Sequence, residues 1–363
     1  MKKILLKFVK NRSRTICPIF IGTGLIGHIN NLIPLKDYSS AVIVTDENIP
    51  AVFIDTLKDL PIRNGVIRIP AGELNKSLDN VQKIWFKLHK IGCDRKSLII
   101  NIGGGIVGDV GGFAASTYMR GIDFMQIPTT LIAQADAGIG GKNGINFDGV
   151  KNLIGLIRQP IGVVMDIDTL KTLPPREFVS GFGEIIKHGL IGDPKLYRFA
   201  VSKKPVEFTK KELVWLVERS CELKAAIVSH DETEKGMRKL LNFGHTLGHA
   251  LEALSLRSRH PLNHGEAVCL GMITESYISY RMGLLALKEF NDIERKIKSL
   301  DLFRPIDNIS DLDVLRVIKS DKKSKQGIVR WTLLTKIGKG KINITVPDII
   351  VSESLQYLRK TSL

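Results

Sequence analysis

Short apolar runs alternate with stretches of helical periodicity in the first half of the chain. Residues Ala41–Thr45, Gly65–Ile69 and Ser97–Ile102 are short, apolar and rich in β-branched residues, which predicts three strands. Residues Ser77–Lys90 and Asp109–Met119 instead repeat apolar residues with the period of an amphipathic helix. This alternation of strand and helix is typical of an α/β domain with a mainly parallel sheet.

The pattern changes in the middle of the chain. Leu173–Pro175 interrupts it, and nearly everything from Phe178 to Lys298 then follows helical periodicity, as in Leu213–Ile227. We therefore predict an α/β domain over residues 1–170 and an all-helical domain over residues 171–363.

The composition is that of an ordinary globular protein. The 363 residues are 44% hydrophobic and 25% charged, and their number suggests two domains. The longest weakly charged stretches, Leu98–Gly108 and Phe124–Gln134, are much too short to span a bilayer, and Lys2, Lys3 and Lys7 interrupt any signal-peptide core. We expect a cytoplasmic protein with no membrane partner.

The cysteines and the net charge exclude further kinds of site and partner. The four cysteines are scattered and contain no C-x-x-C pair, so neither a disulfide framework nor a structural zinc cluster is indicated. The net charge is +16, but the basic residues near the N-terminus and from Arg316 to Lys341 are not interleaved with aromatic residues. We expect no nucleic acid partner, and a positive field suited to small anions.

A glycine cluster follows the third predicted strand. Gly103–Gly108 matches G-x-G-x-x-G between a predicted strand and a predicted helix, where backbone amides and the helix N-terminus can approach a pyrophosphate. Asp46 ends an upstream strand and supplies a carboxylate for a ribose hydroxyl. The alternative is a tight turn without a ligand. The two features together favour a dinucleotide site.

Three motifs in the predicted helical domain carry metal-ligand side chains. Glu184, His245 and His264 would combine a carboxylate with two imidazoles and leave a catalytic zinc ion an open position. However, His245 and His249 are four residues apart on one helical face, and His188 is also available. Spacing alone does not choose among these sets.

Small, basic and amide residues are concentrated between positions 120 and 152, within the predicted α/β domain. Glycines beside Lys142 and Lys151 suggest a loop that wraps a small anion, although a plain glycine-rich connection with solvated lysines is the alternative. A dinucleotide site, a metal site and an anion loop together indicate redox chemistry on a phosphorylated, hydroxylated small molecule. The residues of this cluster are Arg120, Pro128–Thr130, Gln134, Asp136, Gly140–Asn146, Lys151 and Asn152.

At these motifs the sequence resembles the 3-dehydroquinate synthases of the shikimate pathway, which belong to the sugar phosphate cyclases. The resemblance extends from about Val42 to Leu334. One family motif is altered: Asp-Ser-Ser-x-Gly-Gly-Lys-Thr is present as Asp136–Asn143, without three hydroxyl groups. The segments that carry the resemblance are Gly103–Ala115, Arg120–Leu131, Gly140–Lys142, Lys151–Gly155, Glu184–Lys187, Leu241–Thr246 and His264–Val268.

The resemblance implies a dehydroquinate synthase-like fold, with an NAD-binding α/β domain and a helical metal-binding domain. It implies that zinc or cobalt is bound by Glu184, His245 and His264, with His249 beside the metal as a proton-transfer group. The residues that it implies around NAD are Asp46, Glu73, Lys76, Gly105, Asp109, Thr129, Thr130, Lys151, Thr172 and Leu173.

The resemblance also implies which residues bind the substrate. Lys142 would lie between NAD and substrate, and Arg120 would reach the site of a neighbouring subunit, so we expect a homodimer. The remaining implied substrate residues are Asp136, Asn152, Lys187, Lys224, Arg238, Asn242 and one of Lys322, Lys323 or Lys325.

The reaction implied by the resemblance converts 3-deoxy-D-arabino-heptulosonate 7-phosphate to 3-dehydroquinate and phosphate. NAD would remove a hydride from C5, phosphate would then leave by β-elimination, and the hydride would return before ring closure. The anionic sugar phosphate suits a lysine-rich site. The alternatives are another sugar phosphate cyclase, a metal-dependent polyol dehydrogenase, or a basic binding protein that kept the fold without the chemistry.

Overall fold

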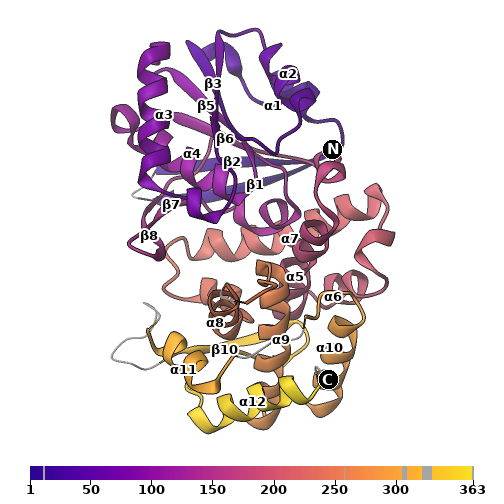
Figure 1. Cartoon of the computed structure of the whole chain (residues 1–363). Coiled ribbons are helices and arrows are strands. Elements are labelled where there is room, and N and C mark those ends of the chain that lie inside the picture. Colours follow the sequence, from indigo (N-terminus) through magenta and orange to yellow (C-terminus); the bar gives the residue numbers. More distant parts are fainter. Residues whose placement is uncertain (11–12, 257, 305–308, 321–328, 362–363) are drawn as a thin grey trace. The chain divides into compact units, whose positions relative to one another are not determined.

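The computed structural model describes residues 1–10, 13–256, 258–304, 309–320 and 329–361, which divide into two compact units (Figure 1). The first unit comprises Met1–Leu173 and Lys210–Ser229, and the second comprises Pro174–Thr209 and His230–Leu363. In the described part of the chain, no helix combines the length and the apolar character needed to cross a membrane.

The first unit is built on a seven-stranded sheet. All its strand pairs are parallel except the antiparallel pair at one edge, which is formed by the first two strands. The predicted α/β domain with a mainly parallel sheet is therefore confirmed. In spatial order the strands are β1 (Lys2–Lys10), β2 (Ser13–Gly22), β9 (Val163–Asp166), β6 (Asp123–Pro128), β5 (Ser97–Gly103), β3 (Ser40–Asp46) and β4 (Asn64–Ile69).

Helices cover both faces of this sheet (Figure 1). Along β3, Val42 packs with α3 (Leu78–Ile91) and α4 (Gly105–Thr117), whereas Ile43 packs with α1 (Ile29–Leu32) and α2 (Ala51–Lys58). Successive strand residues point to opposite faces, so a strand buried on both sides is apolar throughout. This explains why the apolar runs in the sequence predict β3 and β5, which are buried along nearly their whole length. The first unit also includes most of α7 (Lys210–His230).

The glycine-rich segment that we predicted as an anion loop contains an antiparallel hairpin. Its strands are β7 (Lys142–Phe147) and β8 (Val150–Ile157), and they are joined at Asp148 and Gly149. Both turn residues have positive φ, 50° and 71°, as a tight two-residue hairpin turn requires. The prediction of a loop across this whole segment is therefore wrong, because alternating side chains and an Asp-Gly turn favour a hairpin.

The second unit is mainly helical, as predicted, and α9 is buried along most of its length. It contacts α5, α8, α10 and α12. The unit also contains a two-stranded hairpin, which the helical periodicity did not predict. The elements are α5 (Pro175–Gly192), α6 (Pro194–Ala200), α8 (His245–Ser255), α9 (His264–Arg281), α10 (Leu287–Lys298), α11 (Asp311–Ser320), β10 (Trp331–Lys336), β11 (Lys339–Ile344) and α12 (Asp348–Lys360).

Candidate active site

Three predicted ligand side chains converge inside the second unit. Glu184 comes from α5, His245 is the first residue of α8 and His264 is the first residue of α9. The Nε2 atoms of His245 and His264 lie 3.3 and 3.4 Å from the same oxygen, Glu184 Oε1. A carboxylate oxygen and two imidazole nitrogens thus face one another, which is a donor set that suits zinc or cobalt.

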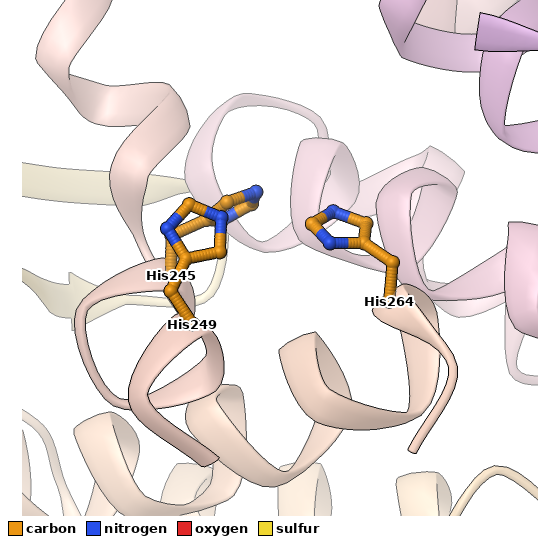
Figure 2. Close-up of side chains that lie close together, drawn as sticks. All are labelled: His245, His249 and His264. Carbon is orange, nitrogen blue, oxygen red and sulfur yellow. The ribbon is translucent and has the colours of Figure 1, made fainter. Parts of the chain in front are cut away.

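His249 lies beside these groups, one turn after His245 on α8 (Figure 2). Its ring centroid is 4.9 Å from that of His245 and 5.7 Å from that of His264. Ligand nitrogens of the three histidines lie within 4.8 Å of one another. Of the candidates that the sequence left open, the structure therefore brings together the histidine pair on α8 and the mixed set with Glu184. His188, the other candidate, is buried on α5.

Close packing of the ligand-bearing helices produces this convergence. A β-carbon on Gly183 would lie 2.7 Å from the carbonyl oxygen of Gly265, and one on Gly248 would lie 2.9 Å from that of Ala267. Real β-carbons essentially never come so close to a backbone oxygen, so α5 and α8 approach α9 backbone to backbone. Gly183 and Gly265 each adjoin a predicted ligand, so the closest approach occurs at the site itself.

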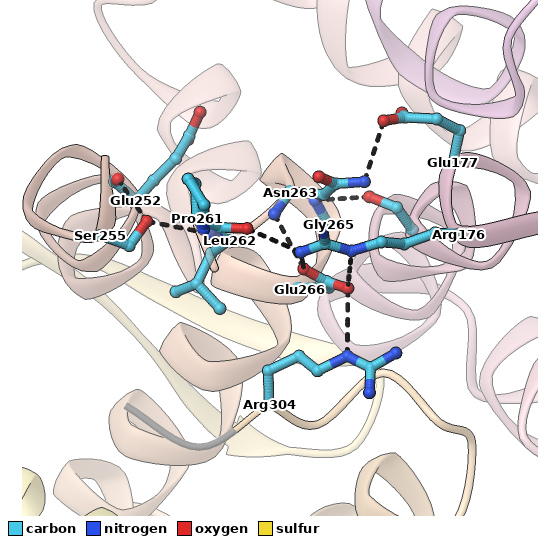
Figure 3. A network of polar contacts seen from close by, with 11 residues as sticks. Arg176, Glu177, Glu252, Ser255, Pro261, Leu262, Asn263, Gly265, Glu266 and Arg304 are labelled. Carbon is cyan, nitrogen blue, oxygen red and sulfur yellow. Dashed lines mark hydrogen bonds and ion pairs between the residues drawn. The ribbon is translucent and has the colours of Figure 1, made fainter. Parts of the chain in front are cut away.

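A polar network fixes the point at which α9 begins (Figure 3). The Glu266 carboxylate accepts hydrogen bonds from Arg176 Nε at 2.9 Å, from Arg176 Nη2 at 2.6 Å and from the backbone N–H of Asn263 at 2.8 Å. Asn263 and Glu266 form a capping box around the first turn, which satisfies N–H groups that have no partner within the helix. Because Arg176 belongs to α5, the network ties the helix of Glu184 to the start of α9 at His264.

The charges of this cluster are strongly coupled. Lys187 forms an ion pair with Glu184, and both side chains are buried. Burial raises the pKa of Glu184, but the neighbouring charges of Lys187 and His245 outweigh it and hold the pKa well below its ordinary value. Burial also lowers the pKa of His264, whereas hydrogen bonds to Glu184 and Glu252 raise it, with a net rise to about 10. The Glu184 carboxylate is therefore ionised beside the positive charges of Lys187 and His264. A metal ion bound here would displace the proton from His264 Nε2.

Two predicted substrate residues lie in a tightly bonded segment of the second unit. Arg238 and Asn242 belong to the 3-10 helix η8 (Met237–Asn242). The Arg238 side chain is only 2% exposed and donates to the carbonyl oxygen of Glu232 at 2.6 Å, and Asn242 Nδ2 donates to Glu234 Oε1 at 2.8 Å. Asp231 accepts three backbone N–H groups from the residues that follow it. Both side chains are thus held before any ligand binds.

The predicted glycine cluster, Gly103–Gly108, lines a pocket in the first unit. β5 ends at Gly103 and α4 begins at Gly105, so the N-terminus of the helix lines the pocket together with Asp109 and Lys142. A β-carbon on Gly103 would lie 2.5 Å from Val107 Cγ2, so this turn requires glycine. A helix N-terminus beside a glycine turn favours the phosphates of a nucleotide.

Other predicted NAD residues lie where strands of this sheet end. Asp46 ends β3 and Thr129 follows β6, and ligands of parallel sheets bind at this edge. Lys76 is buried and pairs with Asp109 at 2.5 Å. Burial raises the pKa of Asp109, although Lys76 opposes the rise. Also in the first unit are Glu73 in the 3-10 helix η3 (Glu73–Asn75), Thr130, Lys151 on β8, and Thr172 and Leu173 at the end of the 3-10 helix η6 (Ile167–Thr172).

The predicted substrate residues of the first unit lie in three places. Lys224 on α7 has its Nζ 2.8 Å from Asp136 Oδ1 in the π-helix η5 (Ala133–Ala137), and 2.6 Å from the carbonyl oxygen of Asp136. Lys142 and Asn152 lie on the hairpin instead. Arg120 ends the 3-10 helix η4 (Tyr118–Arg120) and is exposed, with a φ of 69°. The predicted alternatives Lys322, Lys323 and Lys325 lie outside the described residues.

Sequence reasoning missed the acidic partners of the site. Glu252 lies 3.1 Å from His264 Nδ1, and Glu234 accepts from Asn242. Positions 245, 249 and 252 share one face of a helix, so helical spacing could have placed Glu252 near His245. The sequence contains no comparable signal for its contact with His264, which belongs to another helix.

Known proteins resemble the whole chain. The family model described as 3-dehydroquinate synthase N-terminal matches residues 66–180, and its C-terminal counterpart matches residues 181–324. A curated 3-dehydroquinate synthase from Alkaliphilus metalliredigens is 41% identical over 347 residues, which are 94% of this chain and 96% of that protein.

Two solved structures share the fold. A 2-deoxy-scyllo-inosose synthase complexed with carbaglucose-6-phosphate, NAD⁺ and Co²⁺ has a TM-score of 0.89 at 23% identity, covering 99% of this chain and 100% of that chain. A 2-epi-5-epi-valiolone synthase from Streptomyces hygroscopicus with NAD⁺ and Zn²⁺ bound has a TM-score of 0.84 at 24% identity, covering 97% of this chain and 99% of that chain.

Proposed function

The chain belongs to the 3-dehydroquinate synthase family, and from this premise we propose which of its residues carry out the reaction. The reaction converts 3-deoxy-D-arabino-heptulosonate 7-phosphate to 3-dehydroquinate and phosphate, and it is classed as a carbon–oxygen lyase reaction. The observation that carries the assignment of residues is the convergence of His245 Nε2 and His264 Nε2 on Glu184 Oε1, at 3.3 and 3.4 Å.

Glu184, His245 and His264 would bind one zinc or cobalt ion. The buried Glu184 carboxylate and the two facing imidazoles fit such an ion, because a mixed set of three protein ligands leaves a position open to substrate. When bound, the ion acts as a Lewis acid that lowers the pKa of the C5 hydroxyl group of the substrate.

NAD would bind at the start of α4. The helix N-terminus and its glycines would bind the pyrophosphate, and the Asp46 carboxylate would accept a hydrogen bond from a ribose hydroxyl group. When bound, NAD supplies a hydride acceptor that returns the hydride within the same cycle. The proposed NAD residues are Asp46, Glu73, Lys76, Gly105, Asp109, Thr129, Thr130, Lys142, Lys151, Thr172 and Leu173.

Basic and amide side chains would bind the two anionic groups of the substrate. A phosphate monoester carries about −1.5 to −2 charges at neutral pH, and the substrate also has a carboxylate. Arg238 is suited to this role because its guanidinium is already held by a backbone carbonyl and loses little freedom on binding. The other proposed substrate residues are Arg120, Asp136, Lys142, Asn152, Lys187, Lys224 and Asn242.

His249 would move a proton to and from the C5 oxygen. Its ring lies beside those of His245 and His264, and an imidazole titrates near neutral pH, as a general acid–base group requires. In this assignment His249 is not a ligand. The three histidines therefore have two different roles.

A homodimer and a cytoplasmic location are further parts of the proposal. Strand β8 exposes Val150, Leu153, Ile154 and Ile157 to solvent, and an apolar strand of this kind is suited to contact with a second copy. The four cysteines are free and buried, as is common in the reducing cytoplasm. Light scattering of the purified chain tests the dimer, and cell fractionation tests the location.

An assay with a trace of NAD tests the function. We expect phosphate and 3-dehydroquinate to appear in equal amounts, far in excess of the NAD supplied, because each cycle regenerates the cofactor. Enzyme treated with a chelator should lose this activity and recover it with Co²⁺ or Zn²⁺. Absence of 3-dehydroquinate from the metal-loaded, folded enzyme would exclude the proposed function.

A further inference from the structure

Two carboxylates lie behind the two histidines of the metal site, and neither is a proposed ligand. Glu252 on α8 places its Oε2 3.1 Å from His264 Nδ1. Glu275 on α9 is fully buried and accepts the backbone N–H groups of Gly244 at 2.6 Å and Leu247 at 3.1 Å. One carboxylate therefore contacts a ligand ring, and the other contacts the end of a ligand-bearing helix.

Glu252 selects which nitrogen of His264 is available to a metal. The opposite nitrogen, Nε2, lies 3.4 Å from Glu184 Oε1, on the side of the proposed ligands. A neutral imidazole has one N–H, and a carboxylate can only accept hydrogen bonds. With the proton on Nδ1 facing Glu252, Nε2 keeps its lone pair for the metal. Carboxylate–histidine–metal arrangements use this contact to fix both the tautomer and the orientation of the ring.

Glu275 supplies a cap that α8 cannot provide for itself. The first N–H groups of a helix have no acceptor within it, and a Ser, Thr, Asp or Asn at the N-cap normally accepts one. Here the N-cap is Gly244, with a φ of 77°, and a β-carbon there would lie 2.7 Å from Met272 Cγ. A capping side chain does not fit at this position, so the acceptor comes from the neighbouring helix. Since His245 is the first residue of α8, this contact holds the ligand-bearing end of α8 against α9.

We propose that Glu252 and Glu275 are positioning residues of the metal site. Glu252 holds the ring of His264, and Glu275 holds the backbone that carries His245. The inference rests on the proposed function, since it takes Glu184, His245 and His264 as ligands. It concerns the affinity and geometry of the metal, which can be measured without turnover.

Competition with a chromophoric chelator tests the role of Glu252. We expect Glu252→Ala to weaken Co²⁺ binding by about 10- to 100-fold, as loss of an outer-sphere carboxylate typically does. Glu252→Gln should lose less affinity for Co²⁺, because its amide oxygen still accepts a hydrogen bond from His264 Nδ1. The matched control is Glu353→Gln, which removes a carboxylate that pairs with Arg281 at the opposite end of α9 from His264. The control should bind Co²⁺ like the unaltered chain.

The visible absorption spectrum of the Co²⁺ protein tests the role of Glu275. Displacement of His245 should change the ligand field, so we expect Glu275→Ala to shift the spectrum and weaken Co²⁺ binding, with unchanged NAD affinity. Glu275→Gln retains one acceptor but turns an NH₂ group toward a backbone N–H, so its effect should be smaller but measurable. If the alanine variant does not fold, the glutamine variant decides the question.

The outcomes distinguish a failure of the positioning roles from a failure of the proposed metal site. Wild-type Co²⁺ affinity and an unchanged spectrum in the folded Glu252 and Glu275 variants would overturn the positioning roles. If the unaltered chain itself fails to bind one Co²⁺, the proposed metal site is wrong instead.

Discussion

Gly183 on α5 faces Gly265 on α9 so closely that a β-carbon on Gly183 would lie 2.7 Å from the carbonyl oxygen of Gly265. We predict that Gly183→Ala forces the two helices apart at Glu184 and His264. Overpacking of this kind costs about 1–3 kcal/mol of stability. Metal titration and thermal unfolding should show weaker metal binding and a lower Tm, whereas Gly27→Ala, where nothing lies within 4 Å, should show neither. Unchanged metal affinity in Gly183→Ala would contradict the role of this contact.

The ligand assignment predicts different metal contents for two histidine variants. His249→Ala should keep one divalent ion per chain and lose turnover, because His249 is assigned to proton transfer. His264→Ala should lose the ion, since it removes one of three protein ligands. Elemental analysis after dialysis measures the metal content of both variants. A metal-free His249→Ala beside a fully loaded His264→Ala would show the assignment to be wrong.

The separation of the proposed substrate residues from the proposed NAD residues predicts that Arg238→Ala and Lys187→Ala keep their affinity for NAD. Loss of a charged group that stabilises the reacting anion should reduce kcat by about 100-fold or more. Kinetic measurements and a calorimetric NAD titration of both variants make the test, with metal content checked for Lys187→Ala because Lys187 pairs with Glu184. Folded variants that bind no NAD would contradict the separation.

Two glycines of α4 have different roles and should respond differently to alanine. At Gly105 a β-carbon would meet only Ala137 Cβ, at 3.6 Å, so Gly105→Ala should fold normally but bind NAD more weakly by obstructing the pyrophosphate. At Gly111 it would lie 1.9 Å from Asn101 Oδ1, so Gly111→Ala should lower the Tm. Calorimetry and thermal unfolding compare the pair. Equal NAD affinity in Gly105→Ala and the unaltered chain would count against the nucleotide site.

The sequence predicts the fold best where burial alone determines it. β3, β4 and β5 agree with the predicted strands to within one residue at each end. β3 and β5 are buried on both faces and are therefore largely apolar, whereas the edge strand β4 exposes Arg68 and was found from its β-branched residues. The start of α4 was predicted at Asp109 but lies at Gly105. Glycine disfavours helix in general, so the glycines of this segment gave no helical signal. One of them, Gly108, packs closely on β6, where a β-carbon would lie 3.1 Å from Gln126 Oε1.

The sequence predicts the site only as far as local motifs extend. Single segments of the sequence were enough to identify the glycine cluster Gly103–Gly108 and the types of metal-ligand side chain. They were not enough to decide whether Glu184 or His249 is the third metal ligand. Glu252 and Glu275 act on residues of neighbouring helices, and such contacts leave no periodic signal in a single sequence. The β7–β8 hairpin was missed although Asp148–Gly149 is a strong turn signal, because the basic and glycine residues there favoured an anion loop. The assignment of NAD binding to residues 1–170 and metal binding to residues 171–363 stays a prediction.

The central claim of a synthase with catalytic NAD is tested most directly by the fate of the C5 hydride. With substrate deuterated at C5, we predict that the label appears in 3-dehydroquinate, that phosphate release equals product, and that a trace of NAD supports many turnovers. Accumulation of NADH in proportion to substrate consumed, with the deuterium on the nicotinamide ring, would contradict the account and identify a dehydrogenase instead.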